Sequence, residues 1–541
     1  MSLWTRYSKY RQYFGDIGIA LDVSRMRFSE SFLDDMAELA SRAFNEMKAL
    51  EGGAIANKDE QRMVGHYWLR NPTLAPNDRL RDDIAKVSSQ VKKFVEGVRA
   101  GAISGTKAAK KFTRVLLVGI GGSALGPQLV CDALRKKSSP INMDFLDNTD
   151  PDGILRILQA VESELESTLV LIISKSGKTA ETHNGYLHVK RYFEQKGLNF
   201  SKHAVAITGE GSILDELAKR DSWIARFPMW DWIGGRTSVF SAVGMLPAAL
   251  LGVSTEDFLA GGAAMDEVTR VEDVRKNPAM MLALMWYFAG SGRGLRDMVI
   301  LPYKDRLVLL SKYLQQLVME SLGKERNRRG EVVNQGIAVY GNKGSTDQHA
   351  YVQQLRDGVD NFFVTFIQVL SDVEEGDGSL RAGGALHVEP DITAGDYLNG
   401  FMFGTRSALY ENGRDSITIT IRDLSPKSLG ALISLYERAV GYYASLVDIN
   451  AYHQPGVEAG KLAAGRVIKL QQESLARLRE EKCVNKSFTA MELAEMIKQR
   501  EEVEAIYFIL EHLAANAREG ITQVDGETPD NARFTFFESS H

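Results

Sequence analysis

Two stretches decide the fold of this chain: residues 115–126, VLLVGIGGSALG, and residues 169–182, LVLIISKSGKTAET. Each is an apolar run of strand length that ends in small and hydroxylated residues and continues as a helix-like stretch. Continuous Val, Ile and Leu are typical of buried parallel strands, because a half-exposed strand alternates apolar and polar residues. A Gly- or Ser-rich turn between such a strand and a helix gathers backbone N–H groups at the positive helix end, where phosphate binds. The two turns together predict one small phosphorylated ligand at the carboxyl ends of neighbouring strands.

The first turn leaves a second kind of ligand open. Residues 119–124, GIGGSA, satisfy the G-x-G-x-x-G/A pattern of dinucleotide-binding folds, which is a weak pattern when it stands alone. Asp144 and Asp147 lie roughly 20 residues beyond Gly126, where an acid that binds a ribose belongs. A dinucleotide-dependent oxidoreductase with a nicotinamide cofactor is therefore an alternative interpretation.

The second turn departs from the Walker A loop of nucleotide-binding proteins. It ends in Gly-Lys-Thr, but Ile172 stands where the pattern requires its first glycine. The turn is instead predicted to be a phosphate cradle, whose hydroxyl groups and positive charge come from Ser174, Lys175, Ser176, Lys178 and Thr179. Either turn alone is equally well explained as an ordinary strand–helix turn capped by Ser and Gly, and only the pair favours a ligand site.

Length and composition bound the class of protein. A chain of 541 residues is too long for one core, which predicts two or three domains. The net charge of −5 gives no global basic field for nucleic acid, so an anionic substrate needs locally placed Lys, Arg and helix N-termini. Only Cys131 and Cys483 are present, which argues against a disulfide-stapled secreted fold. The mixed N-terminus and the lack of a membrane-length apolar run predict a cytoplasmic protein.

Strand and helix candidates alternate twice along the chain, over residues 112–252 and residues 296–447. This order is typical of doubly wound parallel sheets, so we predict an α/β fold with two such domains. Helical spacing of Phe32, Met36 and Leu39 predicts a mostly helical N-terminal region. The predicted divisions are a helical region over 1–95, sheet domains over 96–275 and 276–450, and a helical arm over 451–541.

The C-terminal end differs from the rest. Residues 466–518 are helix-rich and charged, and residues 521–536 could form a short hairpin around Asp525 and Gly526. The order of these elements is loosely that of a winged helix. A helical arm that packs on its own body or on a partner is the favoured interpretation.

Polar groups that suit proton transfer lie in separate segments. Gln316 and Glu320 are four residues apart in a predicted helix over 307–323 and share one face among apolar neighbours. A carboxylate beside apolar side chains has a reason to act as a tuned base, although most helical glutamates are simply solvated. Arg236 follows two glycines, which allow its guanidinium to approach a phosphate or an oxyanion closely. His349 lies on a polar loop after a strand, where acid–base groups occur.

Together these segments resemble the phosphoglucose isomerase family, whose members are aldose–ketose isomerases with two sugar isomerase (SIS) domains. Six separated motifs carry the resemblance in the expected order, between about residues 112 and 466. They are GIGGSALG at 119–126, SKSGKTAET at 174–182, GGRTS at 234–238, QQLVMES at 315–321, GNKGSTDQH at 341–349 and YHQPGVEAGK at 452–461. Their spelling is closer to bacterial and plastid members than to animal ones.

The resemblance implies interconversion of glucose 6-phosphate and fructose 6-phosphate through a cis-enediolate. It implies that Glu320 is the base that moves a proton between C2 and C1, and that Arg236 stabilises the enediolate. His349 and Lys461 are implied to assist ring opening. The residues implied to hold the phosphate are Ser174, Lys175, Ser176 and Thr179, and those implied to contact the sugar or order the site are Gly122, Ser123, Gln316 and Gln454.

The family also implies a homodimer in which His349 reaches the site from the partner subunit. No metal or other cofactor and no nucleic-acid or membrane partner is expected. Three departures from the family pattern leave every implied catalytic group in place: His453 stands where many members have Asp, Thr346-Asp347 replaces Asn-Gly, and Leu322 replaces Asn. A catalytically silent sugar-phosphate sensor with a regulatory or nucleic-acid-binding tail is a further alternative, against which the presence of those groups argues.

Overall fold

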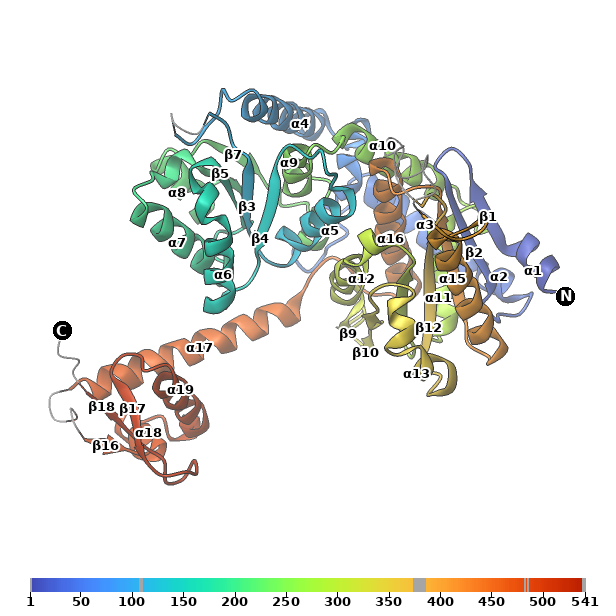
Figure 1. Cartoon of the computed structure of the whole chain (residues 1–541). Coiled ribbons are helices and arrows are strands. Elements are labelled where there is room, and N and C mark those ends of the chain that lie inside the picture. The colour runs from blue at the N-terminus through green and yellow to red at the C-terminus, as the bar shows by residue number, and fades with distance from the viewer. Residues whose placement is uncertain (1, 107–109, 373–385, 481–482, 484–485, 538–541) are drawn as a thin grey trace. The chain divides into compact units, whose positions relative to one another are not determined.

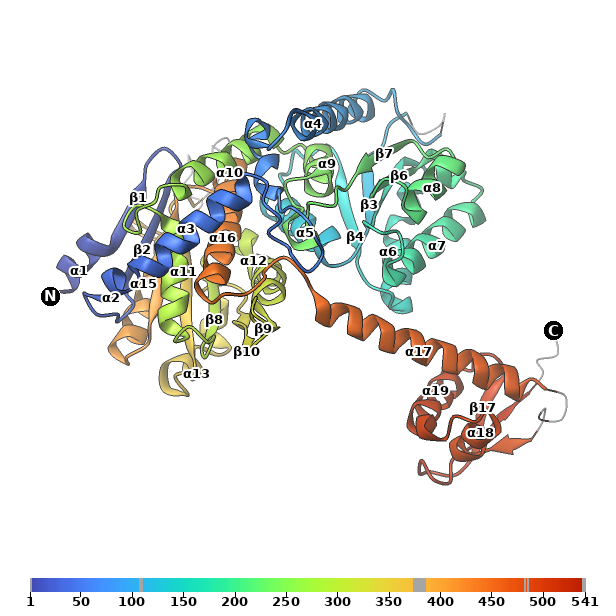
Figure 2. The ribbon, with the colours of Figure 1, turned by 180° about the vertical axis from the view of Figure 1, so that it is seen from behind.

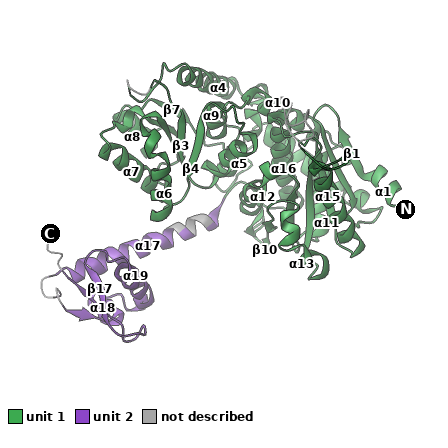
Figure 3. Ribbon diagram, in the orientation of Figure 1, with its two compact units in different colours: residues 1–453 green, residues 454–541 purple. Residues whose placement is uncertain are grey.

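The computed structural model describes residues 2–106, 110–372, 386–480, 483 and 486–537, without the side chains of residues 457–459 and 461. The chain forms two compact units, residues 1–453 and residues 454–541, drawn in green and purple in Figure 3. Among the described residues, no helix combines the length and the apolar character that a membrane span requires. The divisions predicted at residues 95 and 275 lie inside the first unit and stay predictions.

The first unit contains two main sheets, and the first of these is fully parallel with the strand order β4-β3-β5-β6-β7 (Figure 1). Its strands are β3 (Arg114–Val118), β4 (Asn142–Leu146), β5 (Thr168–Ile173), β6 (Ala204–Thr208) and β7 (Ala225–Pro228). Every residue of β5 and β6 is buried, as their continuous apolar runs predict. The predicted doubly wound sheet is confirmed.

Helices cover both faces of this sheet, because its side chains join two separate hydrophobic clusters. On one face lie α4 (Asp78–Arg99), α5 (Leu125–Leu134) and α9 (Ala242–Leu251). On the other face lie α6 (Pro151–Val161), α7 (Ala180–Gln195) and α8 (Ile213–Arg220). The sheet is thus the middle layer of an αβα sandwich, which leaves the ends of its strands as the place for a ligand.

The second sheet has the order β1-β2-β15-β12-β8-β11. Four of its strands are parallel, namely β8 (Asp297–Pro302), β11 (Val339–Tyr340), β12 (Phe362–Val369) and β15 (Ser416–Ile421). The hairpin of β1 (Arg11–Phe14) and β2 (Ile19–Arg25) adds to this sheet, with β2 antiparallel to β15. The prediction of a mostly helical N-terminal region is therefore wrong for this hairpin. Its pairing partner is almost 400 residues away in sequence, so local periodicity could not show it.

Four helices form the core beside the second sheet: α3 (Ala37–Glu51), α10 (Thr255–Thr269), α11 (Pro278–Ala289) and α16 (Pro426–Leu446). α3, α10 and α11 all pack on α16, and Figure 2 shows this group from behind. α16 is buried nearly all round, which explains its lack of a polar face. Gly261 of α10 and Gly430 of α16 let the two helices touch. A Cβ atom at either position would lie about 2 Å from a backbone oxygen of the other helix.

A buried ionic network joins these helices. Arg70 donates to both oxygens of Asp266, at 2.7 and 2.8 Å, and pairs with Glu437. Arg438 donates to Asp266 at 2.8 Å and to Glu51 at 2.6 and 2.9 Å. Burial raises the pKa of Glu437 to about 7, whereas Arg70 and Arg438 outweigh burial at Asp266 and lower its pKa. The network fixes α3 and α10 against α16, and the segment after α16 reaches the candidate site.

The first unit also contains further α-helices and strands. They are α1 (Leu3–Tyr10), α2 (Phe32–Asp35), α12 (Leu310–Leu314), α13 (Val352–Asp357), α15 (Ala394–Glu411), β9 (Lys324–Arg326), β10 (Val332–Gln335), β13 (His387–Glu389) and β14 (Ile392–Thr393).

The second unit has its own hydrophobic core. Its helices are α17 (Pro455–Leu478), α18 (Ala490–Met496) and α19 (Val503–Ala515), and its strands are β16 (Ser487–Phe488), β17 (Ile521–Asp525) and β18 (Arg533–Phe536). The predicted hairpin is present as β17 and β18, and β16 pairs with β18 to give the order β16-β18-β17. The sequence of helix, strand, two helices and hairpin follows the winged-helix alternative.

Candidate active site

Two turns of the first sheet lie side by side, because β3 and β5 are neighbouring parallel strands. The turn after β3 contains the short helix Gly121–Ser123, and the turn after β5 contains residues 174–179. Within the second turn, Ser174 Oγ accepts a hydrogen bond from the Gly177 N–H at 3.2 Å and lies 3.2 Å from Thr179 Oγ1. Ser176 Oγ accepts from the Lys178 N–H at 3.1 Å. The hydroxyl groups of the predicted cradle are thus gathered in one turn at the start of α7.

Lys175 links this cradle to another loop. Its ammonium donates to the carbonyl oxygens of Asp231 and Ile233, at 3.0 and 2.9 Å. Burial lowers the pKa of Lys175 to about 8, and the nearby Asp231 carboxylate opposes this effect. Lys175 therefore brings positive charge to the cradle while it holds the loop that leads to Arg236.

Glycines allow three loops to meet. A Cβ atom at Gly122 would lie 2.0 Å from the carbonyl oxygen of Gly235, so the turn after β3 touches the short helix Gly235–Thr237 directly. Gly121 has a φ of +58°, and a Cβ atom there would lie 3.1 Å from the side-chain nitrogen of Gln316. Larger residues at these positions would separate the loops, which explains the GIGGS and GGR spellings.

Arg236 and Glu320 form an ion pair where these loops meet. Arg236 Nη2 lies 3.3 Å from Glu320 Oε1, and the arginine side chain is 4% exposed against 21% for the glutamate. The guanidinium also donates to the carbonyl oxygens of Ala451 at 2.7 Å and His453 at 3.3 Å. A fixed positive charge therefore stands beside a partly accessible carboxylate, as a carbon-acid reaction requires.

Glu320 ends a π-helical segment, Gln315–Glu320, that follows α12. The single regular helix predicted over 307–323 is thus wrong in detail. A π turn carries one extra residue compared with an α turn, and such turns often occur at functional sites. The segment directs the amide of Gln316 toward Gly121 and the carboxylate of Glu320 toward Arg236.

Known proteins share this sequence and fold. The family model of phosphoglucose isomerase matches residues 22–379 and 402–488. A glucose-6-phosphate isomerase of Geotalea daltonii is 55% identical over 534 residues, which is 99% of each chain. One from Nostoc punctiforme is 54% identical over 528 residues, or 98% of each chain. The chain belongs to the phosphoglucose isomerase family.

Solved structures agree with this family in fold. A glucose-6-phosphate isomerase from Chlamydia trachomatis is similar with a TM-score of 0.76 and 24% identity, over 88% of this chain and 92% of that one. A hypothetical protein from Thermus thermophilus is similar with a TM-score of 0.67 and 27% identity, over 83% of this chain and 99% of that one. The second match shows that a shorter chain has nearly all of its length in common with this one.

For three residues that the phosphoglucose isomerase resemblance assigns to the site, the described residues do not test a place beside the Arg236–Glu320 pair. His349 is exposed in the short helix Thr346–His349, and among the described residues no hydrogen bond or ion pair connects it to that pair. Gln454 and Lys461 belong to the second unit, and the Lys461 side chain is outside the described residues. Their roles stay predictions.

Two departures from the family pattern have structural partners. Asp347 is buried and accepts hydrogen bonds from the Asn342 N–H at 2.8 Å and the Tyr351 hydroxyl at 2.6 Å. It therefore fixes the loop that carries His349. His453 lies with Nε2 3.8 Å from Asp59 Oδ2, and burial lowers the pKa of His453 although Asp59 opposes this.

One charged residue of the site was not predicted from the sequence. Lys324 is 5% exposed, and its ammonium donates to the main-chain carbonyl of Glu320 at 2.7 Å. Burial, with a smaller contribution from the charge of Arg236, lowers the pKa of Lys324 to about 7. Its position four residues after Glu320 was the only signal in the sequence.

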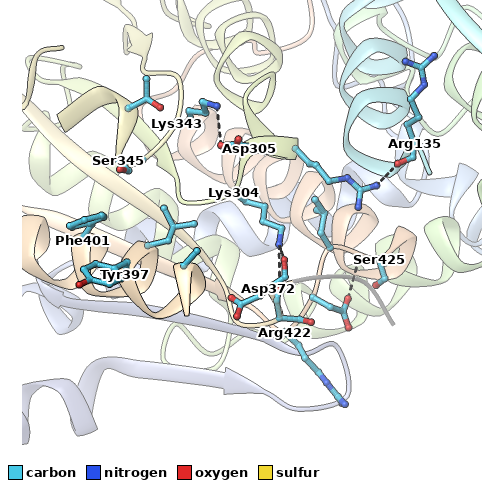
Figure 4. Close-up of a pocket in the computed structure, with 18 of the residues that line it drawn as sticks. Arg135, Lys304, Asp305, Lys343, Ser345, Asp372, Tyr397, Phe401, Arg422 and Ser425 are labelled. Atoms are coloured by element: carbon cyan, nitrogen blue, oxygen red, sulfur yellow. Dashed lines mark hydrogen bonds and ion pairs between the residues drawn. The ribbon is translucent and has the colours of Figure 1, made fainter. Parts of the chain in front are cut away.

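A cavity of about 1730 Å³ lies at the carboxyl ends of the strands of the second sheet, and none of the predicted site residues lines it (Figure 4). Lys304 donates to the carbonyl oxygens of Ser371 at 3.1 Å and Asp372 at 2.5 Å. Lys343 pairs with Asp305 at 2.9 Å. These cations are already bound within the protein.

Among the described residues, no group of three or more His, Cys, Asp or Glu could hold a metal ion.

Proposed function

We propose that this chain interconverts glucose 6-phosphate and fructose 6-phosphate through a cis-enediolate, with Glu320 as the base. Membership of the phosphoglucose isomerase family makes the protein an isomerase. In this chain the proposal is carried by the Arg236–Glu320 pair, 3.3 Å apart, beside two turns that are suited to phosphate. The turn after β3 borders the pair, because Gly122 meets Gly235 and Gly121 lies against Gln316. This supports a base and a phosphate site that are close enough to act on the same sugar phosphate.

Proton transfer at carbon needs a base and a charge that stabilises the resulting anion. Starting from the open aldose, the Glu320 carboxylate takes the proton from C2, and the electrons of the C–H bond form the C1–C2 double bond. The carbonyl π electrons move to O1, whose negative charge lies within reach of the Arg236 guanidinium. Return of the proton from Glu320 to C1, with transfer of the O2 proton to O1 directly or through solvent, gives the ketose.

Binding of the phosphate is assigned to the turn after β5. Ser174, Ser176 and Thr179 would donate hydrogen bonds, while Lys175 contributes charge from its position on the carbonyls of residues 231 and 233. Gly122, Ser123 and Gln316 border the pair and would contact the sugar, together with Gln454 of the second unit. His349 and Lys461 are proposed to move protons during ring opening.

The proposal includes a homodimer, in the cytoplasm, in which His349 serves the partner's site. It is supported by the exposure of His349 and by the rigid loop that Asp347 holds. Mixing Glu320→Gln with His349→Ala subunits tests this arrangement. In the mixed dimer one of the two sites regains both groups if His349 acts across the interface. The mixed dimer should then have about half of the wild-type activity, and an equal, randomly assorted mixture about a quarter. Activity that stays absent in a proven mixed dimer would place His349 within its own subunit.

Other functions find less support in the first unit. The two acids available for a ribose are engaged, since Asp144 pairs with Arg114 at 2.6 Å and Asp147 accepts from Gln128 at 2.8 Å. In the second unit, α19 exposes Glu504, Phe508, Glu511 and His512, and it contains no Lys or Arg. Neither observation favours a dinucleotide or a nucleic acid.

Proton NMR of glucose 6-phosphate in D₂O tests the function, with enzyme, a chelator and no nucleotide. We expect fructose 6-phosphate to form with deuterium at C1 or C2, because an enediolate exchanges its proton with solvent. Folded protein that leaves glucose 6-phosphate unchanged under these conditions would refute the proposal.

A further inference from the structure

Lys324 is a buried cation that the reaction scheme does not use. It is the first residue of β9, directly after the helix that carries Glu320. The residue is only 5% exposed to solvent. Burial of a lysine is costly unless its ammonium is well bound, so this position needs an explanation.

The ammonium binds the end of the Glu320 helix. It donates to the carbonyl oxygen of Glu320 at 2.7 Å and to that of Gly323 at 3.3 Å. Carbonyl groups in the last turn of a helix have no partner within the helix, and a lysine there also interacts favourably with the helix dipole. The Glu320 carbonyl thus has a side-chain donor at the point where the π segment ends.

Charged groups from three other segments face Lys324. Arg236 contributes a like charge, while Glu320 and Asp59 contribute opposite charges. His453 feels the charge of Lys324 as well. Within the described part of the chain, no carboxylate lies within 4.0 Å of the ammonium, so Lys324 is not simply half of an ion pair. Its charge acts on the Arg236–Glu320 pair as a whole.

We propose that Lys324 is a positioning residue for the reaction: its hydrogen bonds hold the turn that carries Glu320, so that the carboxylate stays beside Arg236. This inference rests on the proposed function of Glu320.

The geometric role predicts a loss of turnover rather than of binding. With Lys324→Met, the last turn loses its donor and the carboxylate is less well held. A base displaced by a fraction of an ångström loses rate steeply, so we expect kcat to fall about tenfold or more. KM should change by less than about threefold, because the phosphate cradle is on other loops.

A conservative variant separates this role from a general effect of substitution. Lys324→Arg keeps a donor that can reach the last carbonyl groups of the helix, so its kcat should lie close to that of wild type.

The experiment measures kcat and KM of full-length wild type, Lys324→Met, Lys324→Gln and Lys324→Arg with glucose 6-phosphate. Lys312→Met removes an exposed lysine from the same helical stretch and should match wild type. Lys324→Gln keeps a donor on a shorter side chain, so its kcat should lie between those of Met and wild type. It replaces Met in the test if that variant does not fold.

The outcomes separate this inference from the function itself. A wild type without isomerase activity would refute the proposed function. An active wild type, together with folded Met and Gln variants whose kcat matches that of wild type, would overturn the positioning role of Lys324.

Discussion

The crevices at the carboxyl ends of the two sheets differ in chemistry although they occupy the same place in the same architecture. In the first, the turns after β3 and β5 carry glycines and hydroxyl groups, and a Cβ atom at Gly122 would strike the neighbouring loop. In the second, the loops carry long charged side chains that bind one another or main-chain carbonyls. The fold fixes where a ligand can bind, and the loop residues decide whether it does.

The second sheet contributes to the site in another way. The helical segment after β8 brings Glu320 to Arg236, and Lys324 secures its end. In the proposed site, the first sheet thus supplies the anion site and the second supplies the base. The following predictions test this division, starting with the largest expected effect.

Arg236 lies where the loops of the first sheet meet Glu320. Its substitution should lower activity more than that of any other residue except Glu320. Arg236→Met removes the charge proposed to stabilise the enediolate, so kcat should fall about 10²–10³-fold. Arg236→Lys should recover only part of this, because one ammonium cannot replace the two nitrogens that bind the carbonyls of Ala451 and His453. Steady-state kinetics measure both variants. An unchanged kcat with a raised KM would make Arg236 a phosphate ligand instead.

Gly122→Ala tests the contact between loops. Its methyl group would lie 2.0 Å from the Gly235 oxygen, so the two turns must move apart and kcat/KM should fall roughly 10- to 100-fold. Gly400→Ala is the matched control, because nothing lies within 4 Å of a Cβ atom there. Equal activity of the two variants would contradict the proposed role of the close contact.

The cradle and the second crevice can be compared directly. Ser176→Ala combined with Thr179→Ala removes two donors to the phosphate, so KM should rise about tenfold with a smaller change in kcat. Lys304→Met in the second crevice should leave KM within about twofold of wild type. If Lys304→Met raised KM as much as the cradle variant, the second crevice would be the phosphate site.

Lys324 should give the smallest effect, in the pH dependence of stability. Burial lowers its pKa to about 7, below the usual lysine value of 10.5. Between these values the unfolded chain binds a proton that the folded chain lacks, so stability rises with pH. The free energy of unfolding should gain on the order of 1–2 kcal/mol between about pH 7 and 9, and Lys324→Met should lose this gain. Denaturant titrations across this range measure it, and an identical slope in both proteins would contradict the burial of a lysine with a lowered pKa.

The sequence predicted the parts of the molecule that depend on local pattern. Continuous apolar runs predicted β3 and β5, and the small residues after them predicted the two turns. Glu320 and Arg236 were singled out from short motifs, and the structure brings them together. Their roles stay predictions.

Features that depend on distant partners could not be predicted. The β1–β2 hairpin forms because β15 offers an edge, and the π segment at Gln315–Glu320 forms where two sheets and several loops must fit. Lys324 is an ordinary lysine in the sequence, and only its burial beside Arg236 distinguishes it. Tertiary context decided each of these cases.

Deuterium exchange at C2 of glucose 6-phosphate in D₂O, compared between wild type and Glu320→Gln, tests the central claim most directly. Gln keeps the size of the side chain but cannot accept the proton, so substrate binding should remain while exchange and isomerisation fall by at least ~10²–10⁴-fold. Exchange at a rate close to that of wild type in a folded Glu320→Gln enzyme would show that another group takes the proton.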